Sequence, residues 1–335
     1  MELLLLNQED VEALLPMPEC IEVIEEALRA LARGEATLPL RSIHWGPERR
    51  GALGLMPSFT ASPSLLGVKV ISYFPGNLGS ELDSHQGVVL LFEGDRGRPL
   101  ALLDATSITS IRTAAASGVA TRALARPDAG DLAILGSGTE ARTHLQAMAA
   151  ARKLRRVRVW SRSLDNARAF AERESRRAGI AIEPIATARE AVAGADLICT
   201  TTSATEPVLC GEWLSPGAHV NAVGACFPAA REIDGPAVAR SRLFVDRRES
   251  ALNEAGDFLI ARREGFVTDA HILGEVGDLL LGRIPGRTSA DDITLFKSLG
   301  ISVEDLAAGH HVYRKALAQG AGTRIAWGGL RQGAV

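Results

Sequence analysis

The 335-residue chain lacks the features that define several specialised classes of protein. No stretch reaches the roughly 18 consecutive apolar residues of a transmembrane helix, so the sequence predicts no membrane partner. Its four cysteines lie far apart and form no Cys-x-x-Cys pair, which argues against a structural zinc site and against a disulfide framework. A net charge of −3 provides no general basic field for a nucleic acid. We therefore expect a cytoplasmic protein with reduced thiols, no metal ion and no nucleic-acid partner.

Lysine is equally scarce. The 37 basic residues comprise 33 arginines and only four lysines, which are Lys69, Lys153, Lys297 and Lys315. Where arginine is the general cation, a lysine that remains is a candidate for chemistry of its own. The motifs Gly-x-Ser-x-Gly, His-Glu-x-x-His and the phosphate-loop Gly-Lys-Ser/Thr are also missing, so the chemistries that they carry find no support.

The feature that says most about function is an apolar strand that runs into Gly-x-Gly-x-x-Ala and then into a helix. This arrangement is typical of a dinucleotide-binding turn. Gly136 allows the tight turn, Gly138 lets the backbone approach the pyrophosphate, and Ala141 lets the helix pack closely on the strand. The cofactor residues expected from this turn are Gly136, Ser137, Gly138, Thr139, Glu140 and Ala141.

The end of the next strand indicates which dinucleotide binds. About 20 residues past the turn, an NAD enzyme places an acidic residue on the ribose 2′-hydroxyl. Here the strand ends in Ser161, Arg162 and Ser163, and the first acid is Asp165. A guanidinium between two hydroxyls suits a 2′-phosphate, so we favour NADPH over NADH. The alternative is that Arg162 is a solvated loop charge in an arginine-rich chain.

Two patterns of secondary structure follow one another along the chain. Residues 1–104 predict an amphipathic helix over 18–33 and then short strands separated by turn residues. A long helix is expected over 105–125, and from 131 to about 246 strands alternate with helices, as in a doubly wound parallel sheet. The expected strands are 38–45, 51–57, 65–74, 87–93, 100–104, 132–135, 156–160, 180–184, 197–200, 219–223 and 242–245. Further helices are expected at 187–193, 271–281 and 302–318, with a last strand at 324–327.

The length suggests two domains, and no linker separates them. We expect an α/β fold in which a Rossmann domain, residues 119–304, is inserted into an α+β domain made of residues 1–118 and 305–335.

Two charged residues stand out in apolar surroundings. Lys69 lies at the centre of an apolar strand, where a charge is costly unless it has a partner, and a substrate carboxylate would be one. The alternative is an edge-strand lysine that points to water. Arg112 lies in a helix of small residues and offers a bidentate fork to a carboxylate, while Thr109 and Thr113 offer hydroxyls to the cofactor. Tight helix packing, with Arg112 in an internal ion pair, is the alternative for that helix.

Taken together, these motifs resemble the ornithine cyclodeaminase/mu-crystallin family. The resemblance covers nearly the whole chain, and it is specific because its segments occur in order. They are Arg41, residues 54–57 and 67–70, the 109–116 helix, the nucleotide turn, and residues 206–208, 221–224 and 296–300.

The resemblance implies homodimers whose first domains bind substrate and pair through their sheets, and enzymes that act on the α-carbon of small amino or imino acids. It makes Arg41, Lys69 and Arg112 the holders of the substrate carboxylate. It also assigns to the cofactor the remaining residues Thr200, Thr201, Thr202, Val223, Gly224, Ser298, Leu299 and Gly300.

Within the family, the cyclodeaminases carry an acidic residue just after the Val-Gly pair, where Cys226 stands here. Ornithine deamination is therefore disfavoured, and residues 161–163 resemble the NADPH-preferring mu-crystallin branch. We predict NADPH-dependent reduction of the cyclic ketimines Δ1-pyrroline-2-carboxylate and Δ1-piperideine-2-carboxylate to L-proline and L-pipecolate. The alternatives are an alanine-type or N-alkyl amino acid dehydrogenase, an ornithine cyclodeaminase, and a non-enzymatic protein that binds NADPH or a small ligand.

Overall fold

The computed structural model describes residues 1–77 and 80–329, and the chain divides into two compact units. Unit 1 comprises Met1–Arg112 together with the residues from Ile301 onward, and unit 2 comprises Thr113–Gly300. The sequence predicts boundaries after residues 118 and 304, whereas the division falls after Arg112 and Gly300. The first of these positions lies inside helix α3 (Ala105–Leu124), which contributes to both units.

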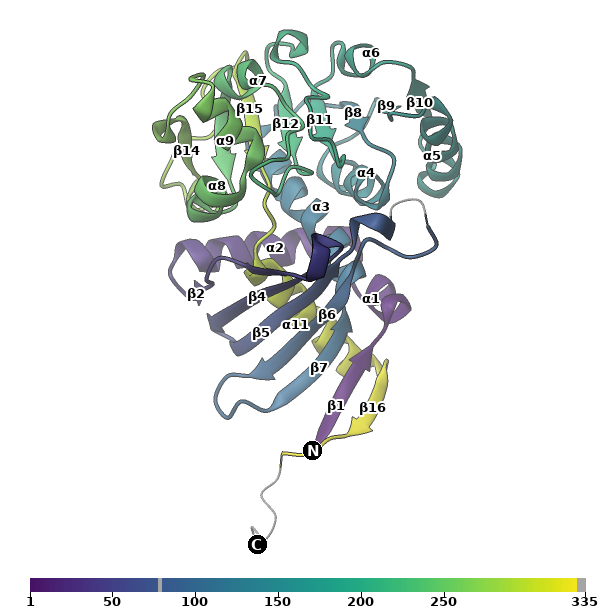
Figure 1. The fold of residues 1–335 in the computed structure, drawn as a ribbon, viewed down its shortest axis with the longest axis vertical. Coiled ribbons are helices and arrows are strands. Elements are labelled where there is room, and N and C mark those ends of the chain that lie inside the picture. The colour runs from purple at the N-terminus through teal and green to yellow at the C-terminus, as the bar shows by residue number, and fades with distance from the viewer. Residues whose placement is uncertain (78–79, 330–335) are drawn as a thin grey trace, which may run out of the picture. The chain divides into compact units, whose positions relative to one another are not determined.

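Unit 1 is built on an eight-stranded mixed sheet (Figure 1). Its order is β16-β1-β7-β6-β5-β4-β2, with β3 also paired to β4. Strands β3 to β7 pair antiparallel along the chain, while β1 lies parallel to β7. The strands are β1 (Glu2–Leu6), β2 (Ala36–Thr37), β3 (Ser42–Trp45), β4 (Ala52–Ala61), β5 (Ser64–Tyr73), β6 (His85–Glu93), β7 (Pro99–Asp104) and β16 (Thr323–Ala326).

Helices cover one face of this sheet. Helix α11 (Ser302–Gln319) packs on β4, β5 and β6 and against α2 (Met17–Ala32), and α1 (Gln8–Leu14) contacts α11 and β7. Helix α2 is amphipathic as predicted, because Ile21, Ile24 and Leu28 recur at helical spacing and are fully buried. The core of unit 1 therefore lies between the sheet and these helices.

Unit 2 is a parallel sheet of eight strands in the order β10-β9-β8-β11-β12-β15-β13-β14. The Rossmann-like α/β fold predicted from the sequence is confirmed. The strands are β8 (Asp131–Leu135), β9 (Arg156–Trp160), β10 (Ile182–Ile185), β11 (Leu197–Thr200), β12 (His219–Ala222), β13 (Ser241–Val245), β14 (Ile272–Glu275) and β15 (Ile293–Lys297). The helices that accompany α3 are α4 (Thr139–Ala151), α5 (Leu164–Ala178), α6 (Ala188–Val192), α7 (Gly235–Ala239), α8 (Arg248–Glu254), α9 (Gly256–Arg263) and α10 (Val276–Leu280).

Two histidines are fully buried inside unit 2. His144 on α4 shares a hydrogen bond of 3.0 Å with Ser117, and His219 on β12 contacts Thr294 and Asn221. Burial lowers the pKa of His144 to about 4 and that of His219 to about 3, so both rings are neutral near pH 7.

None of the helices within the described ranges is long and apolar enough to span a bilayer.

The segment beyond residue 246 differs from the prediction. Residues 272–275 of the expected helix 271–281 instead form strand β14, and only Val276–Leu280 is helical. Pairing with β13 decides this, since the buried Ile272 lies beside Leu243 at the edge of the sheet. Strand β15 was not foreseen at all, although all five of its residues are buried between β12 and β13. A short apolar run does not by itself distinguish a buried strand from other buried structure.

Candidate active site

Strand β5 places Lys69 inside unit 1. The strand pairs with β4 on one side and β6 on the other, and Lys69 lies between Met56 and Val89. Its side chain is only 2% exposed, so it is not an edge-strand lysine that points to water. The ammonium Nζ donates to Asp305 Oδ1 at 3.0 Å and to Thr109 Oγ1 at 3.2 Å. The partner that a buried lysine requires is therefore an aspartate at the start of α11.

The same aspartate binds Arg112. Arg112 lies on α3 and is 3% exposed. Its Nε donates to Asp305 Oδ1 at 2.8 Å, and its Nη1 donates to Glu304 Oε2 at 3.0 Å. The internal ion pair considered for Arg112 is thus present, and it is part of a larger cluster. We call Lys69, Arg112, Glu304 and Asp305 the buried charge cluster.

The cluster shifts the proton affinity of its members. Burial, with a smaller contribution from the positive charges of Arg112 and Arg41, lowers the pKa of Lys69 to about 8 against the attraction of Asp305. Burial alone would raise the pKa of Asp305, but Arg112 and Lys69 hold it below its ordinary value. Lys69 is therefore an ammonium at neutral pH and loses its proton at mildly alkaline pH.

The other residues predicted beside the cluster lie on neighbouring elements. Arg41 is half-buried, directly precedes β3, and is near enough to influence Lys69. Thr109, predicted as a cofactor ligand, accepts the hydrogen bond from Lys69, while Thr113 is the first residue of unit 2 and is buried. Glu304 and Asp305 were missed by sequence reasoning. Acidic residues are common in the first turn of a helix, so these two gave no sign in the sequence that they are buried and bind cations.

The nucleotide turn in unit 2 has the geometry that a pyrophosphate requires. Gly136 has φ +129°, and a Cβ there would lie 2.6 Å from the carbonyl oxygen of Thr201, so no other residue fits without strain. Gly138 begins α4, has open space where a Cβ would be, and provides no side-chain cap. Ala141 is fully buried. Gly138 thus puts no side chain over the N-terminus of α4, as an anion site there needs.

The three residues after β9 have different surroundings. Ser137 in the turn donates to Ser161 at 3.0 Å, which joins the two segments predicted to hold the adenosine half. Ser163 accepts from the backbone N–H of Asn166 and so begins α5. Arg162 is exposed, and within residues 1–77 and 80–329 it has no ion-pair partner. It is free of a competing carboxylate in that part of the chain.

The remaining predicted cofactor residues follow the carboxyl ends of β11, β12 and β15 and share one edge of the sheet. The N–H of Val223 donates to the carbonyl oxygen of Thr200. Leu299 and Gly300 donate their N–H groups to Asp246 Oδ2, at 2.6 and 2.8 Å. The Ser298 hydroxyl is buried and has no hydrogen-bond partner among the described residues. An unpaired buried hydroxyl at this edge fits a ligand group that would bind it.

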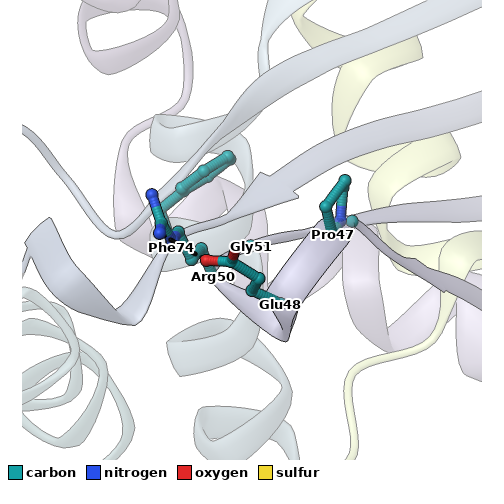
Figure 2. Close-up of a pocket in the computed structure, with 6 residues that line it drawn as sticks. Pro47, Glu48, Arg50, Gly51 and Phe74 are labelled. Carbon is teal, nitrogen blue, oxygen red and sulfur yellow. Dashed lines mark ion pairs between the residues drawn. The ribbon is translucent and has the colours of Figure 1, made fainter.

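Unit 1 also has a surface depression, which is lined by residues outside the buried charge cluster. It has a volume of about 320 Å³ and lies on the turn between β3 and β4 and the end of β5 (Figure 2). Its lining residues are Gly46, Pro47, Glu48, Arg50, Gly51 and Phe74. Glu48 and Arg50 form an exposed ion pair with each other. None of these residues belongs to the buried charge cluster.

Comparisons with known proteins identify the family. A model of the ornithine cyclodeaminase/mu-crystallin family matches residues 1–320. The chain belongs to this family. It is similar to the ketimine reductase mu-crystallin of Mus musculus, with 38% identity over 296 residues that cover 88% of this chain and 90% of that protein.

Solved structures of the family have the same fold over almost the full length. The Δ1-pyrroline-2-carboxylate reductase of Thermococcus litoralis, in complex with NADH and L-proline, has a TM-score of 0.93 at 41% identity and covers 96% of this chain and 99% of that chain. An archaeal alanine dehydrogenase dimer with bound NAD has a TM-score of 0.91 at 32% identity and covers 98% of this chain and 100% of that chain. The family predicted from the sequence is confirmed.

Proposed function

We propose that this chain is an NADPH-dependent ketimine reductase that reduces Δ1-pyrroline-2-carboxylate and Δ1-piperideine-2-carboxylate to L-proline and L-pipecolate. The general activity is not in question, because the chain is a nicotinamide-dependent oxidoreductase acting on carbon–nitrogen bonds. The prediction of an enzyme is confirmed at this level. The proposal concerns the ring substrate, the residues that act on it and the preference for a 2′-phosphate.

The observation that carries the proposal is the pair of cations joined by Asp305. Lys69 and Arg112 are balanced by Glu304 and Asp305, and Arg41 adds a third positive charge near Lys69. These five side chains together carry one more positive than negative charge while Lys69 is protonated, which suits one substrate carboxylate. Fixing that carboxylate orients the imine carbon, and orientation accounts for much of the rate in such a reaction.

Proton delivery follows from the same geometry. A bound reduced nicotinamide would supply hydride to the imine carbon. The imine nitrogen then has to gain a proton, and Lys69, with a pKa of about 8, holds one at neutral pH that it can donate. Asp305 holds Lys69 in place and keeps it an ammonium. The relative that was crystallised with NADH and L-proline supports a five-membered ring as substrate class.

Residues of unit 2 fit the cofactor. The N-terminus of α4, where Gly138 has no side chain, suits a pyrophosphate. The Ser298 hydroxyl, which binds none of the described residues, lies at the edge predicted for the nicotinamide half. Arg162, with the hydroxyls of Ser161 and Ser163 beside it, supports a 2′-phosphate. Asp165, the first acid after the strand, is already within ion-pair distance of Arg168 at 3.2 Å.

A homodimer is part of the proposal. On the face of the unit 1 sheet opposite α11, apolar residues run across three strands in rows, such as Leu55, Val70 and Val88. On β4, Leu53 and Phe59 belong to the same face and are 43% and 44% exposed. A wide apolar sheet face indicates an interface, and the related alanine dehydrogenase is a dimer. Light scattering of the intact protein tests this, and Val70→Asp should shift it towards monomer.

The test of function follows NADPH absorbance with Δ1-pyrroline-2-carboxylate and Δ1-piperideine-2-carboxylate, with NADH in a parallel cuvette. Rapid oxidation of NADPH and slow oxidation of NADH is the expected result. Turnover of L-alanine with an oxidised cofactor, and none with either imine, would support the alanine dehydrogenase alternative. Cofactor oxidation with neither imine would refute the proposed ring substrates.

A further inference from the structure

A buried carboxylate that plays no part in the proposed reaction lies behind the predicted cofactor edge. Glu232 is 0% exposed and lies between β12 and α7. Its Oε1 accepts from the backbone N–H and the hydroxyl of Thr202, at 2.6 and 2.8 Å. Its Oε2 accepts from the Thr200 hydroxyl at 2.8 Å and from the backbone N–H of Gly224 at 2.6 Å. All four donors belong to residues that the sequence assigned to the cofactor.

The carboxylate therefore joins two segments that come from different strands. Thr200 ends β11, Thr202 lies two residues further on, and Gly224 follows β12. The segments are in direct contact, because a Cβ on Gly224 would lie 2.0 Å from the carbonyl oxygen of Thr202. Without Glu232, the partly buried N–H groups of Thr202 and Gly224 would lose this acceptor, at a cost that the segments could relieve by moving.

Glu232 is itself held in place. Its backbone N–H and that of Ile233 donate to Asp257 Oδ1, at 2.7 and 3.1 Å. The other oxygen of Asp257 lies 3.0 Å from the ammonium of Lys297, the last residue of β15, and Lys297 donates to the carbonyl oxygen of Ala222. The carboxyl ends of β11, β12 and β15 are thereby tied together through buried polar groups.

The position of these strands indicates which half of a dinucleotide they meet. The pyrophosphate turn follows β8, and the predicted 2′-phosphate site follows β9 on one side of it. Strands β11 and β12 lie on the other side of β8. A dinucleotide that spans this switch in strand order places its nicotinamide half there. The Glu232 contacts therefore concern the nicotinamide half and not the adenosine half.

We infer that Glu232 is a positioning residue that sets the spacing of the 200–202 and 224 segments around the nicotinamide half of the cofactor. This inference rests on the proposed function, since it assumes a nicotinamide dinucleotide on this edge. The role requires a carboxylate and not merely a side chain of this shape. Each of its two oxygens accepts one backbone N–H, so in Glu232→Gln the amide NH₂ faces an N–H group in either orientation.

The experiment compares two ligands on the intact protein. NADPH contains both halves of the dinucleotide, whereas 2′-phospho-ADP-ribose lacks the nicotinamide. Titration calorimetry of Glu232→Gln should show about a tenfold loss of affinity for NADPH, the consequence of one partly buried N–H group that loses its acceptor. Affinity for 2′-phospho-ADP-ribose should be unchanged. Glu174→Gln is the matched control, because Glu174 is a buried acid on α5 whose ion pairs within the described residues are with Arg173 and Arg177 of the same helix.

Each outcome separates the inference from the proposal beneath it. Equal affinity of Glu232→Gln and the natural protein for NADPH would overturn the inference, as would a parallel loss for both ligands, which indicates general destabilisation. Failure of the natural protein to bind NADPH would instead overturn the proposed function. If Glu232→Gln does not fold, Thr200→Val removes one hydroxyl donor and leaves no N–H unpaired. It should weaken NADPH binding alone, and unchanged NADPH binding would count against the inference.

Discussion

Replacing Asp305 with asparagine tests the account of the buried charge cluster most directly. Asp305 is 1% exposed, and its Oδ1 accepts hydrogen bonds from Lys69 and Arg112. Both of its oxygens lie 3.0 Å from the Lys69 ammonium. Asparagine keeps the shape but removes the negative charge, and its NH₂ group would face either that ammonium or the guanidinium. Both effects favour the neutral amine, so the pKa of Lys69 should fall below its value of about 8.

The size of the effect follows from the distance. An opposite charge this close shifts a pKa by about 1 to 3 pH units, or about 1.4 to 4 kcal/mol of interaction. If protonated Lys69 is the form that acts, kcat should decline as pH rises through about 8 in the natural protein. In Asp305→Asn the same decline should appear about 1 to 3 pH units lower.

The assay is the pH profile of kcat for imine reduction, measured with thermal melts that confirm folding. Glu304→Gln is the matched control, because it removes a buried negative charge that binds Arg112 from the neighbouring position, whereas Asp305 binds Lys69 directly. It should move the alkaline limb less than Asp305→Asn does. A folded Asp305→Asn variant whose alkaline limb stays near pH 8 would refute the reasoning, since Asp305 would not then control the proton on Lys69.

Three further predictions concern other sites. Lys69→Met should lower kcat by about 100-fold or more and leave NADPH affinity unchanged, as single-turnover and binding measurements would show; near-normal turnover would remove Lys69 from proton transfer. Arg162→Ala should raise KM for NADPH about tenfold or more and leave KM for NADH unchanged, with Arg168→Ala as control; a parallel rise for both cofactors would contradict a 2′-phosphate site. His144 and His219 have folded pKa values of about 4 and about 3, below the ordinary 6.5, so the unfolded chain binds more protons than the folded one as the pH falls below 6.5. The free energy of unfolding, measured by urea titration, should therefore fall by about 2 kcal/mol per histidine between pH 7 and 5. A flat profile would contradict their burial.

Much of the fold could be predicted because its signals are local. The bounds of β9 and β11 agree with the predicted residues, and the nucleotide turn lies where Gly136 and Gly138 placed it. Periodicity failed at residues 272–275, because pairing with β13 is a tertiary event that the local pattern does not encode.

The site was predicted from its cations and missed in its anions. A lysine inside an apolar strand is visible because it violates the pattern around it, so Lys69 could be found. Its partner Asp305 lies 236 residues later in sequence, on a helix whose first turn ordinarily carries acids. Glu232 gave no signal at all, since a glutamate between a strand and a helix is ordinarily a surface residue. Burial, which only the structure shows, distinguishes these acids from the rest.

The apolar outer face of the unit 1 sheet has a thermodynamic consequence. If two copies meet through it, association removes the rows of Leu55, Val70 and Val88 from water, and each subunit is stabilised in proportion to the logarithm of the concentration of its partner. The melting temperature would then rise with protein concentration, and no single free energy of unfolding would describe the chain. Stability would be a property of the solution as much as of the sequence.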